Sequence, residues 1–151
     1  MGSELELPPE CGASILAAFW NPVQFPGLND WTAMNKFRRN DAKKQLQRGV
    51  FLAARAAGIK QGLPPAYWTY FLCERKRNRD PSNIAAIASK VIEDAMQAGG
   101  YIANDGWDDI LGIQYFWRKQ LPAGICVVVS DSPLSRSEAE TMVTKLSKPK
   151  R

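Results

Sequence analysis

The sequence predicts a single compact domain of the α/β class in mixed α+β form. We expect a mixed sheet of about four strands, two main helices and a C-terminal helix. The length of 151 residues is usual for one domain, and the hydrophobic content of 45% is ordinary for a globular protein. Short apolar runs alternate with segments of helical periodicity, and no internal repeat is visible.

Two strands are expected in the first half of the chain. Residues 1–12 form a polar lead-in, and the apolar run SILAAFW, residues 14–20, predicts a buried strand. The stretch 21–30 contains two prolines and is expected to be an ordered loop. Residues 66–73, AYWTYFLC, are aromatic and β-favouring, so they predict the second strand.

The first main helix is predicted over residues 34–57 and ended by Gly58. Its apolar stripe contains Phe37, Leu46, Val50, Phe51 and Ala54. Its basic face contains Lys36, Arg38, Arg39, Lys43, Lys44, Arg48 and Arg55. Gly49 weakens the helix, so a break near Asn40 is an open alternative. The basic face is either a solvated surface or a surface that contacts nucleic acid.

The second main helix begins with a strong start signal. Pro81 suits the first helical position and Asp80 the N-cap before it, while Gly99-Gly100 ends the helix. The apolar residues that recur at helical spacing predict one buried face. They are Ile84, Ile87, Ala88, Val91, Ile92, Ala95 and Met96.

The last third of the chain predicts two apolar strands and a final helix. The strands are residues 110–117 and 124–131, and the intervening RKQLPA is expected to connect them as a hairpin. Residues 132–151 contain an amphipathic helix over 135–148, capped by Ser135 or Ser137, and a basic tail.

Charge and composition restrict the function classes. The net charge of +5 favours a polyanionic partner without requiring one. The chain has no histidine, which excludes Ser-His-Asp triads, Cys-His dyads and His-ligated zinc. Catalysis would therefore depend on carboxylates, lysines, hydroxyls or a metal held by oxygen.

Cysteine usage and hydropathy favour a cytoplasmic protein. Cys11, Cys73 and Cys126 lie far apart, which indicates reduced thiols and neither a disulfide framework nor a zinc site. No apolar run approaches the roughly 20 residues that span a membrane. The N-terminus MGSELELPPE is acidic where a signal peptide would be basic, so secretion is not expected.

Carboxylates at two places could form a metal site. Asp80 follows a basic run of Arg75, Lys76, Arg77 and Arg79, and the acidic turn 101–109 carries Asp105, Asp108 and Asp109. If the strand after that turn pairs beside the strand ending near Cys73, the two clusters can approach. Without histidine, such carboxylates suit Mg²⁺ or Mn²⁺. Each part also has a plain alternative, Asp80 as a helix cap and the others as turn formers.

The stretch RNRDPSNIAAIASKVIEDAMQAGGYIANDGWDDI resembles the core of the RusA-like Holliday-junction resolvases of phages and prophages. The family pattern is a basic run, Asp-x-Asp-Asn, a helix ending near Asp-Ala-Leu, a Gly and an acidic turn. The matching residues are Arg77, Arg79, Asp80, Asn83, Asp94-Ala95-Met96, Gly100 and Asp105. Upstream, WNPVQFPGLNDW is similar to the family's early proline-rich loop. The resemblance covers roughly residues 14–130, and its specific part is 77–107.

The resemblance implies a homodimeric, Mg²⁺-dependent endonuclease, encoded by a phage or prophage, that cuts four-way DNA junctions. Asp80 and Asp105 would hold the metal, with Mn²⁺ as an alternative ion. The DNA-binding set would be Lys76, Arg77, Arg79, Asn83, Arg38, Arg39, Lys43 and Lys44. The dimer surface stays open, because the apolar segment 110–130 and the aromatic residues around Trp107 and Trp117 suit a core equally well.

Two departures from the family pattern put cleavage in question. Ser82 stands where the family has its second Asp, and Ala86 stands where a helix lysine assists. Lys90, one turn later, is the candidate replacement for that lysine. The candidate compensators for the lost acid are Ser82, Glu74, Asp94 and Asp108, although Asp94 better suits a structural salt bridge.

Two other functions therefore stay open. One is a weakened family member that binds branched DNA without efficient cleavage. The other is an unrelated α/β protein whose basic face contacts RNA or an acidic protein.

Overall fold

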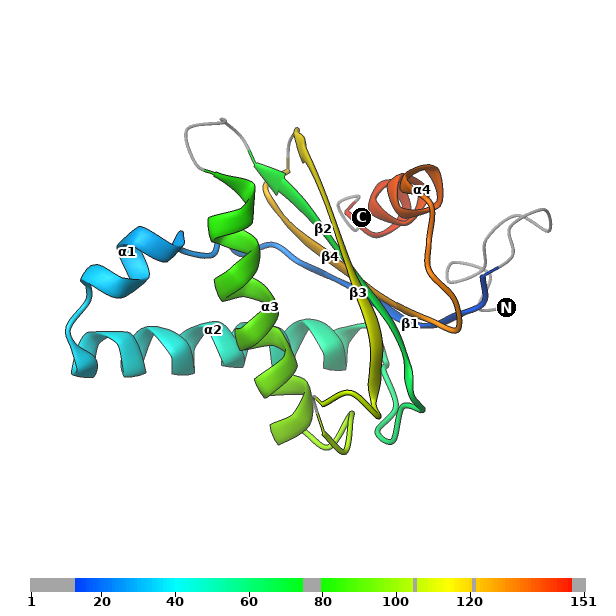
Figure 1. The fold of residues 1–151 in the computed structure, drawn as a ribbon, viewed down its shortest axis with the longest axis horizontal. Coiled ribbons are helices and arrows are strands. Elements are labelled where there is room, and N and C mark those ends of the chain that lie inside the picture. The colour runs from blue at the N-terminus through cyan, green and yellow to red at the C-terminus, as the bar shows by residue number, and fades with distance from the viewer. Residues whose placement is uncertain (1–12, 75–79, 105, 121, 148–151) are drawn as a thin grey trace.

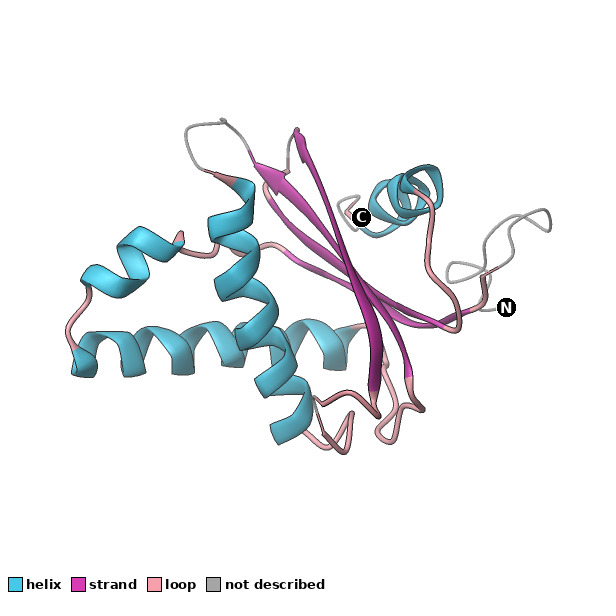
Figure 2. Cartoon of the chain, viewed as in Figure 1, coloured by secondary structure: helices cyan, strands magenta, loops and turns pink. Residues whose placement is uncertain are grey.

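The described residues fold as a four-stranded mixed sheet, as predicted, with four helices where two main helices and a C-terminal helix were expected (Figures 1 and 2). The computed structural model describes residues 13–74, 80–104, 106–120 and 122–147. The elements are β1 (Ile15–Asn21), α1 (Leu28–Ala33), α2 (Lys36–Ala56), β2 (Ala66–Glu74), α3 (Pro81–Ala98), β3 (Ile110–Lys119), β4 (Gly124–Ser130) and α4 (Arg136–Leu146). In these described ranges, no helix is long and apolar enough to cross a membrane.

The strand order is β1-β4-β2-β3, which corrects one prediction. β4 pairs antiparallel with β1 and β2, while β3 pairs parallel with β2. The expected hairpin between β3 and β4 is therefore wrong, because β2 lies between them. Their short connection crosses the end of β2, where the Gln120 N–H donates to the Glu74 carbonyl at 3.0 Å.

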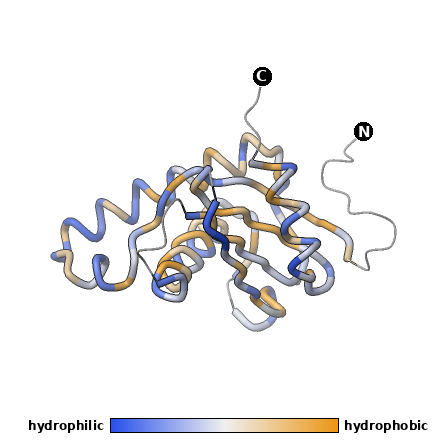
Figure 3. Tube along the Cα trace, turned by 90° about the horizontal axis from the view of Figure 1, so that it is seen from above, coloured by the Kyte–Doolittle hydropathy of each residue, from blue (hydrophilic) through white to orange (hydrophobic). Residues whose placement is uncertain are grey.

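The helices form a layer on each face of the sheet (Figure 1). α2 and α3 cover one face, where the larger core includes Phe19, Trp68, Tyr70 and Ile92. α4 covers the other face, where a smaller core forms around Phe71, Cys126 and Met142. Figure 3 shows hydrophobic segments along the strands at the centre of the molecule and hydrophilic positions along α2.

The predicted helix boundaries of α3 are confirmed. The Asp80 side chain caps the N-terminus, Pro81 occupies the first helical position, and Gly99 is the C-cap. Gly100 has a φ of +77°, a left-handed conformation that favours glycine at the helix stop. All seven residues predicted for the buried face of α3 are buried.

The region before and along α2 differs from the prediction in two ways. Leu28–Ala33 forms a short helix, where an ordered loop was expected for the residues up to Asp30. α2 itself runs without a break at Asn40, which decides the open alternative in favour of one helix. Phe37 is 80% exposed, although it was placed in the apolar stripe. The reason is that the N-terminal half of α2 extends beyond the sheet and has no strand to pack on (Figure 1).

Candidate functional site

Asp80 is an exposed carboxylate at the mouth of α3. Its Oδ1 atom accepts hydrogen bonds from the Ser82 N–H and from Ser82 Oγ, each at 3.0 Å. Both donors are neutral, so they orient the carboxylate without cancelling its charge. The free N–H groups of the first helical turn further favour an anion here.

Ser82 and Asn83 lie in that first turn beside Asp80. Ser82 is exposed, and its hydroxyl donates to Asp80 where the resembling family would place a second carboxylate. The Asn83 N–H donates to the Asp80 carbonyl at 3.1 Å, and its side chain is half-buried. The described part of the site therefore has one negative charge at this turn.

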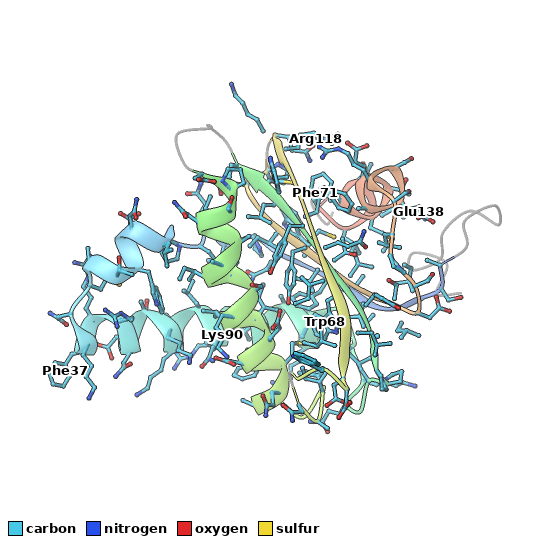
Figure 4. The ribbon with its side chains drawn as sticks, in the orientation of Figure 1. Phe37, Trp68, Phe71, Lys90, Arg118 and Glu138 are labelled. Atoms are coloured by element: carbon cyan, nitrogen blue, oxygen red, sulfur yellow. The ribbon has the colours of Figure 1, made fainter. Side chains whose placement is uncertain are left out.

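The ends of β2 and β3 lie beside the start of α3. Together they enclose an apolar hollow of about 50 Å³, lined by Leu72, Glu74, Pro81, Ile84, Trp117, Arg118 and Lys119. Glu74, one candidate compensator, is half-buried at this end. Arg118 turns toward α4, where it pairs with Glu140 at 2.7 Å and lies over Phe71, while Lys119 is exposed (Figure 4).

Asn21 adds a polar group at the same end of the sheet. It ends β1 opposite Ile125, and Ile125 in turn pairs with Leu72 near the end of β2. The Asn21 side chain is fully buried, and neither amide atom has a hydrogen-bond partner among the described residues. An unpaired buried amide costs about 1–3 kcal/mol, so Asn21 is a further residue to test at this end.

The acidic turn lies at the opposite end of the sheet. β3 does pair beside β2 as expected, but the pairing is parallel, so Ile110 lies beside Ala66 and Lys119 beside Glu74. The nine-residue strand β2 spans about 26 Å. The expected approach of Asp80 to Asp108 and Asp109 is therefore wrong within one chain, and Asp105 lies outside the described residues.

Asp94, another candidate compensator, forms structural salt bridges, the role that the sequence analysis favoured for it. Its two carboxylate oxygens pair with Lys43 and Lys90, each at 3.2 Å. Partial burial raises the pKa of Asp94, but hydrogen bonds from Lys43 and Lys90 outweigh this and lower the pKa below its ordinary value. Its charge is compensated inside the protein, which makes Asp94 a poor metal ligand.

Lys90 cannot serve Asp80 within one chain. The two residues are ten positions apart on α3, a rise of about 15 Å along the helix axis. The Lys90 ammonium points toward Asp94, one further turn away, on the side of α3 that faces α2 (Figure 4). Its predicted catalytic role at Asp80 therefore has no geometric support here.

A basic cavity of about 220 Å³ lies between α1, α2 and α3. Its lining is Trp31, Arg39, Asn40, Lys43, Ile87, Lys90 and Val91. Arg39 donates to the carbonyls of Trp31 and Met34 at the end of α1, at 3.3 and 2.9 Å, so it also has a structural role. Arg38 and Lys44 are exposed to solvent on the same helix.

The remaining predicted DNA-binding residues, Lys76, Arg77 and Arg79, lie outside the described residues.

Compared with known proteins, the chain matches no family model and no curated protein. What it does must therefore be inferred from its own residues.

The donors near Asp80 suit a hard cation. Mg²⁺ in proteins uses one or two carboxylates and completes its octahedron with water and substrate phosphate. Asp80 and Glu74 both lie at this end of the sheet and offer carboxylate oxygen. Within the described ranges, however, no three carboxylates or thiols gather to form a complete site. The chemistry of these donors fits Mg²⁺, and the described residues of one chain supply few ligands.

The sequence pattern did not reveal the role of two groups of residues on β3. Arg118 and Lys119 were read as part of a hairpin connection, yet they end β3 beside the candidate site. The second group is the outward stripe of β3, which includes Ile113 (41% exposed) and Trp117 (47% exposed). Both alternating sets of residues in ILGIQYFW contain large apolar side chains, so alternation could not reveal which face is buried.

Proposed function

We propose that this chain is a RusA-like, Mg²⁺-dependent endodeoxyribonuclease that acts on four-way and other branched DNA during recombination or replication. The observation that carries the proposal is Asp80, an exposed helix-capping carboxylate that only neutral Ser82 donors contact in the described structure. The sequence around it resembles the family's Asp-x-Asp-Asn signature. The proposed setting is the bacterial cytoplasm, with a phage or prophage origin.

In this proposal Asp80 holds the cation and the basic residues hold the DNA. A bound Mg²⁺ would activate a water molecule and offset the charge that grows on the phosphate as the P–O bond breaks. The Ser82 donors keep the Asp80 carboxylate in one orientation. Lys119 and the exposed cations of α2, Arg38 and Lys44, supply charge for the phosphate backbone.

The second predicted ligand, Asp105, requires a second copy of the chain in this proposal. Asp105 precedes Asp108 by three residues, and three residues of extended chain span about 10 Å. Asp108 is separated from the Asp80 end by the length of β2, about 26 Å. Asp80 of one copy and Asp105 of another would therefore act together, which agrees with the homodimer that the resemblance implies.

The alternative is a weakened member that binds branched DNA without efficient cleavage. Ser82 favours it, because a serine hydroxyl brings no charge and its proton is donated to Asp80. Losing one acid of three weakens the affinity for a hard cation, whereas contacts between lysine or arginine and phosphate do not depend on it.

The test is a labelled synthetic four-way junction incubated with the protein and Mg²⁺, with a linear duplex of the same sequence as control. Paired symmetric nicks in the junction alone would support the nuclease. A gel shift of the junction without product, in Mn²⁺ as well, would refute cleavage and support the alternative. Equal affinity for junction and linear duplex would refute both.

A further inference from the structure

β3 is an edge strand with an open backbone side. It pairs with β2 on one side, and no described strand lies on its other side. Unpaired strand edges with apolar side chains are sites for pairing with another chain, which proteins usually block with charges, prolines or bulges. β3 has no proline, and its described bulge lies at its beginning, where Ile110 pairs with Ala66 and Gly112 with Tyr67, so that Leu111 is the extra residue.

An exposed apolar stripe runs along β3 on the face that α3 covers in part. Its members are Leu111 (49% exposed), Ile113 (41%), Tyr115 (36%) and Trp117 (47%). Tyr115 fixes the side of the sheet, because it stacks on Tyr70 and donates to Ser89 of α3. Four consecutive outward positions of one strand thus expose large hydrophobic side chains, which single-chain proteins rarely do at a strand edge.

The two ends of β3 carry opposite charges. Asp108 and Asp109 precede the strand, and Arg118 and Lys119 end it. A second β3 in antiparallel orientation would place the acidic start of each strand beside the basic end of the other. A parallel orientation would place like charges side by side, which is unfavourable.

We infer that the open edge of β3 binds the same edge of a second copy of this chain, as an antiparallel pair with a two-fold axis at Gln114. Because the axis passes through Gln114, the numbers of two residues that face each other across the pair add up to 228. Ile113 then faces Tyr115 of the second copy, the bulge at Leu111 lies beside its Trp117, and the end of β3 that follows Asp109 lies beside its Lys119. The apolar stripes of the two copies lie side by side on the same face, and a continuous eight-stranded sheet results.

The backbone direction agrees with this register. The Gln120 N–H donates to the Glu74 carbonyl, so near this end the even-numbered residues of β3 direct their backbone groups toward β2. The odd-numbered residues, Ile113, Tyr115 and Trp117, direct theirs outward. At present Arg136 of α4 donates to the Trp117 carbonyl at 2.9 Å, so this outward carbonyl must exchange that donor for a backbone N–H of the second copy in the pair.

Trp107 provides a second contact in the same arrangement. It is 95% exposed in the turn that precedes β3. In the antiparallel pair, the turn that carries Trp107 lies at the end of the second copy that holds the apolar hollow beside Trp117. A large exposed indole at one end of the strand is thus brought to the end that carries an apolar surface.

The pairing does not depend on nuclease activity, although it would supply the second copy that the proposed function needs. A dimer of the predicted register without cleavage would uphold the pairing and refute the nuclease. Cleavage by a monomeric protein would uphold the nuclease and refute the pairing.

The first experiment is light scattering after size exclusion, with Ile113→Lys as the test variant and Leu52→Lys as the matched control. Leu52 is 60% exposed on α2, away from the strand edge, so both changes add one charge to an exposed apolar position. We expect a dimer for the wild type and for Leu52→Lys, and a Kd raised at least about tenfold for Ile113→Lys. A wild-type monomer, or equal dimerisation of the two variants, would overturn the inference.

The second experiment tests the register by disulfide formation, in a background with Cys11→Ser. Burial raises the pKa of Cys73 to about 11, and Cys126 is fully buried, so neither native thiol interferes. A mixture of Leu111→Cys and Trp117→Cys proteins should cross-link, since these two positions lie side by side in the proposed pair. Leu111→Cys protein alone should not cross-link, because the two Leu111 positions of the pair lie about 20 Å apart. Cross-linking of Leu111→Cys alone at an equal rate would contradict the register.

Discussion

Two aspartates on the same helix have opposite surroundings. Asp80 caps the N-terminus of α3 and accepts hydrogen bonds from the neutral donors of Ser82. Asp94 lies near the other end, bridges Lys43 and Lys90, and has a lowered pKa. The charge of Asp94 is therefore cancelled within the protein, whereas the described partners of Asp80 orient its carboxylate without cancelling its charge.

This difference shows why proximity to basic residues does not identify a metal ligand. Asp94 satisfies the sequence criterion of an acid among cations, and its partners show that it stabilises the contact between α2 and α3. Asp80 satisfies a stricter criterion, a carboxylate whose described partners are neutral. Three substitutions test the contrast.

The largest effect is expected from Asp80→Asn, compared with Asp94→Asn. Asparagine is as good an N-cap as aspartate, so folding should be unchanged while the charge for the metal is lost. We expect junction cleavage to fall at least about 100-fold for Asp80→Asn and to change less than about threefold for Asp94→Asn, measured as single-turnover rates. Junction binding by Asp80→Asn should be unchanged or tighter, because repulsion of phosphate decreases.

A circular dichroism spectrum and a melting temperature like those of the wild type are the control for Asp80→Asn. Equal losses of cleavage in the two variants would contradict the distinction between the two aspartates. The loss would then reflect a general need for negative charge along α3.

A smaller effect, in the opposite direction, is expected from Ser82→Asp. A second carboxylate about 3 Å from Asp80 creates a stronger hard-cation site and, without metal, like-charge repulsion. We expect cleavage to rise about tenfold and Mg²⁺ to raise the melting temperature of the variant more than that of the wild type. An unchanged rate together with an unchanged response to Mg²⁺ would mean that Asp80 is only a helix cap.

The smallest effect concerns the stability that Asp94 contributes. Its pKa is lowered from an ordinary value of 3.8, so its contribution is present above that value and is lost as the pH falls through the folded-state pKa. Because Lys43 and Lys90 are substantially exposed, water screens both pairs. We expect the wild type to exceed Asp94→Asn by at most about 1 kcal/mol in the free energy of unfolding in urea at pH 7, with the gap closing as the pH falls through the lowered pKa of Asp94. A gap that persists at pH 2 would show that the effect is not electrostatic.

Local signals in the sequence predicted the elements because each signal has a local physical cause. Asp80-Pro81 satisfies the free groups of a helix start, and Gly58 and Gly100 adopt the left-handed conformation that ends a helix. The buried face of α3 follows from its periodicity. The order of the strands has no such local cause.

Strand pairing and solvent exposure depended on distant parts of the chain. The apolar runs of β3 and β4 are compatible with a hairpin, and only the insertion of β2 between them decides otherwise. Parallel pairing of β2 with β3 then separated Asp80 from Asp108, although the sequence had grouped them. Phe37 has the right period for a core position but lies where α2 has passed the sheet.

The position of β1 at one edge of the sheet has a consequence for folding. Its described strand partner is β4, and the pairing of Ile15 with Ser130 closes a loop of more than 100 residues. Contacts of such long range form slowly, because the entropy of loop closure is lost before the contact is gained. During synthesis, β1 must therefore wait until residues 124–130 have left the ribosome, exposing an apolar strand to chaperones throughout that time.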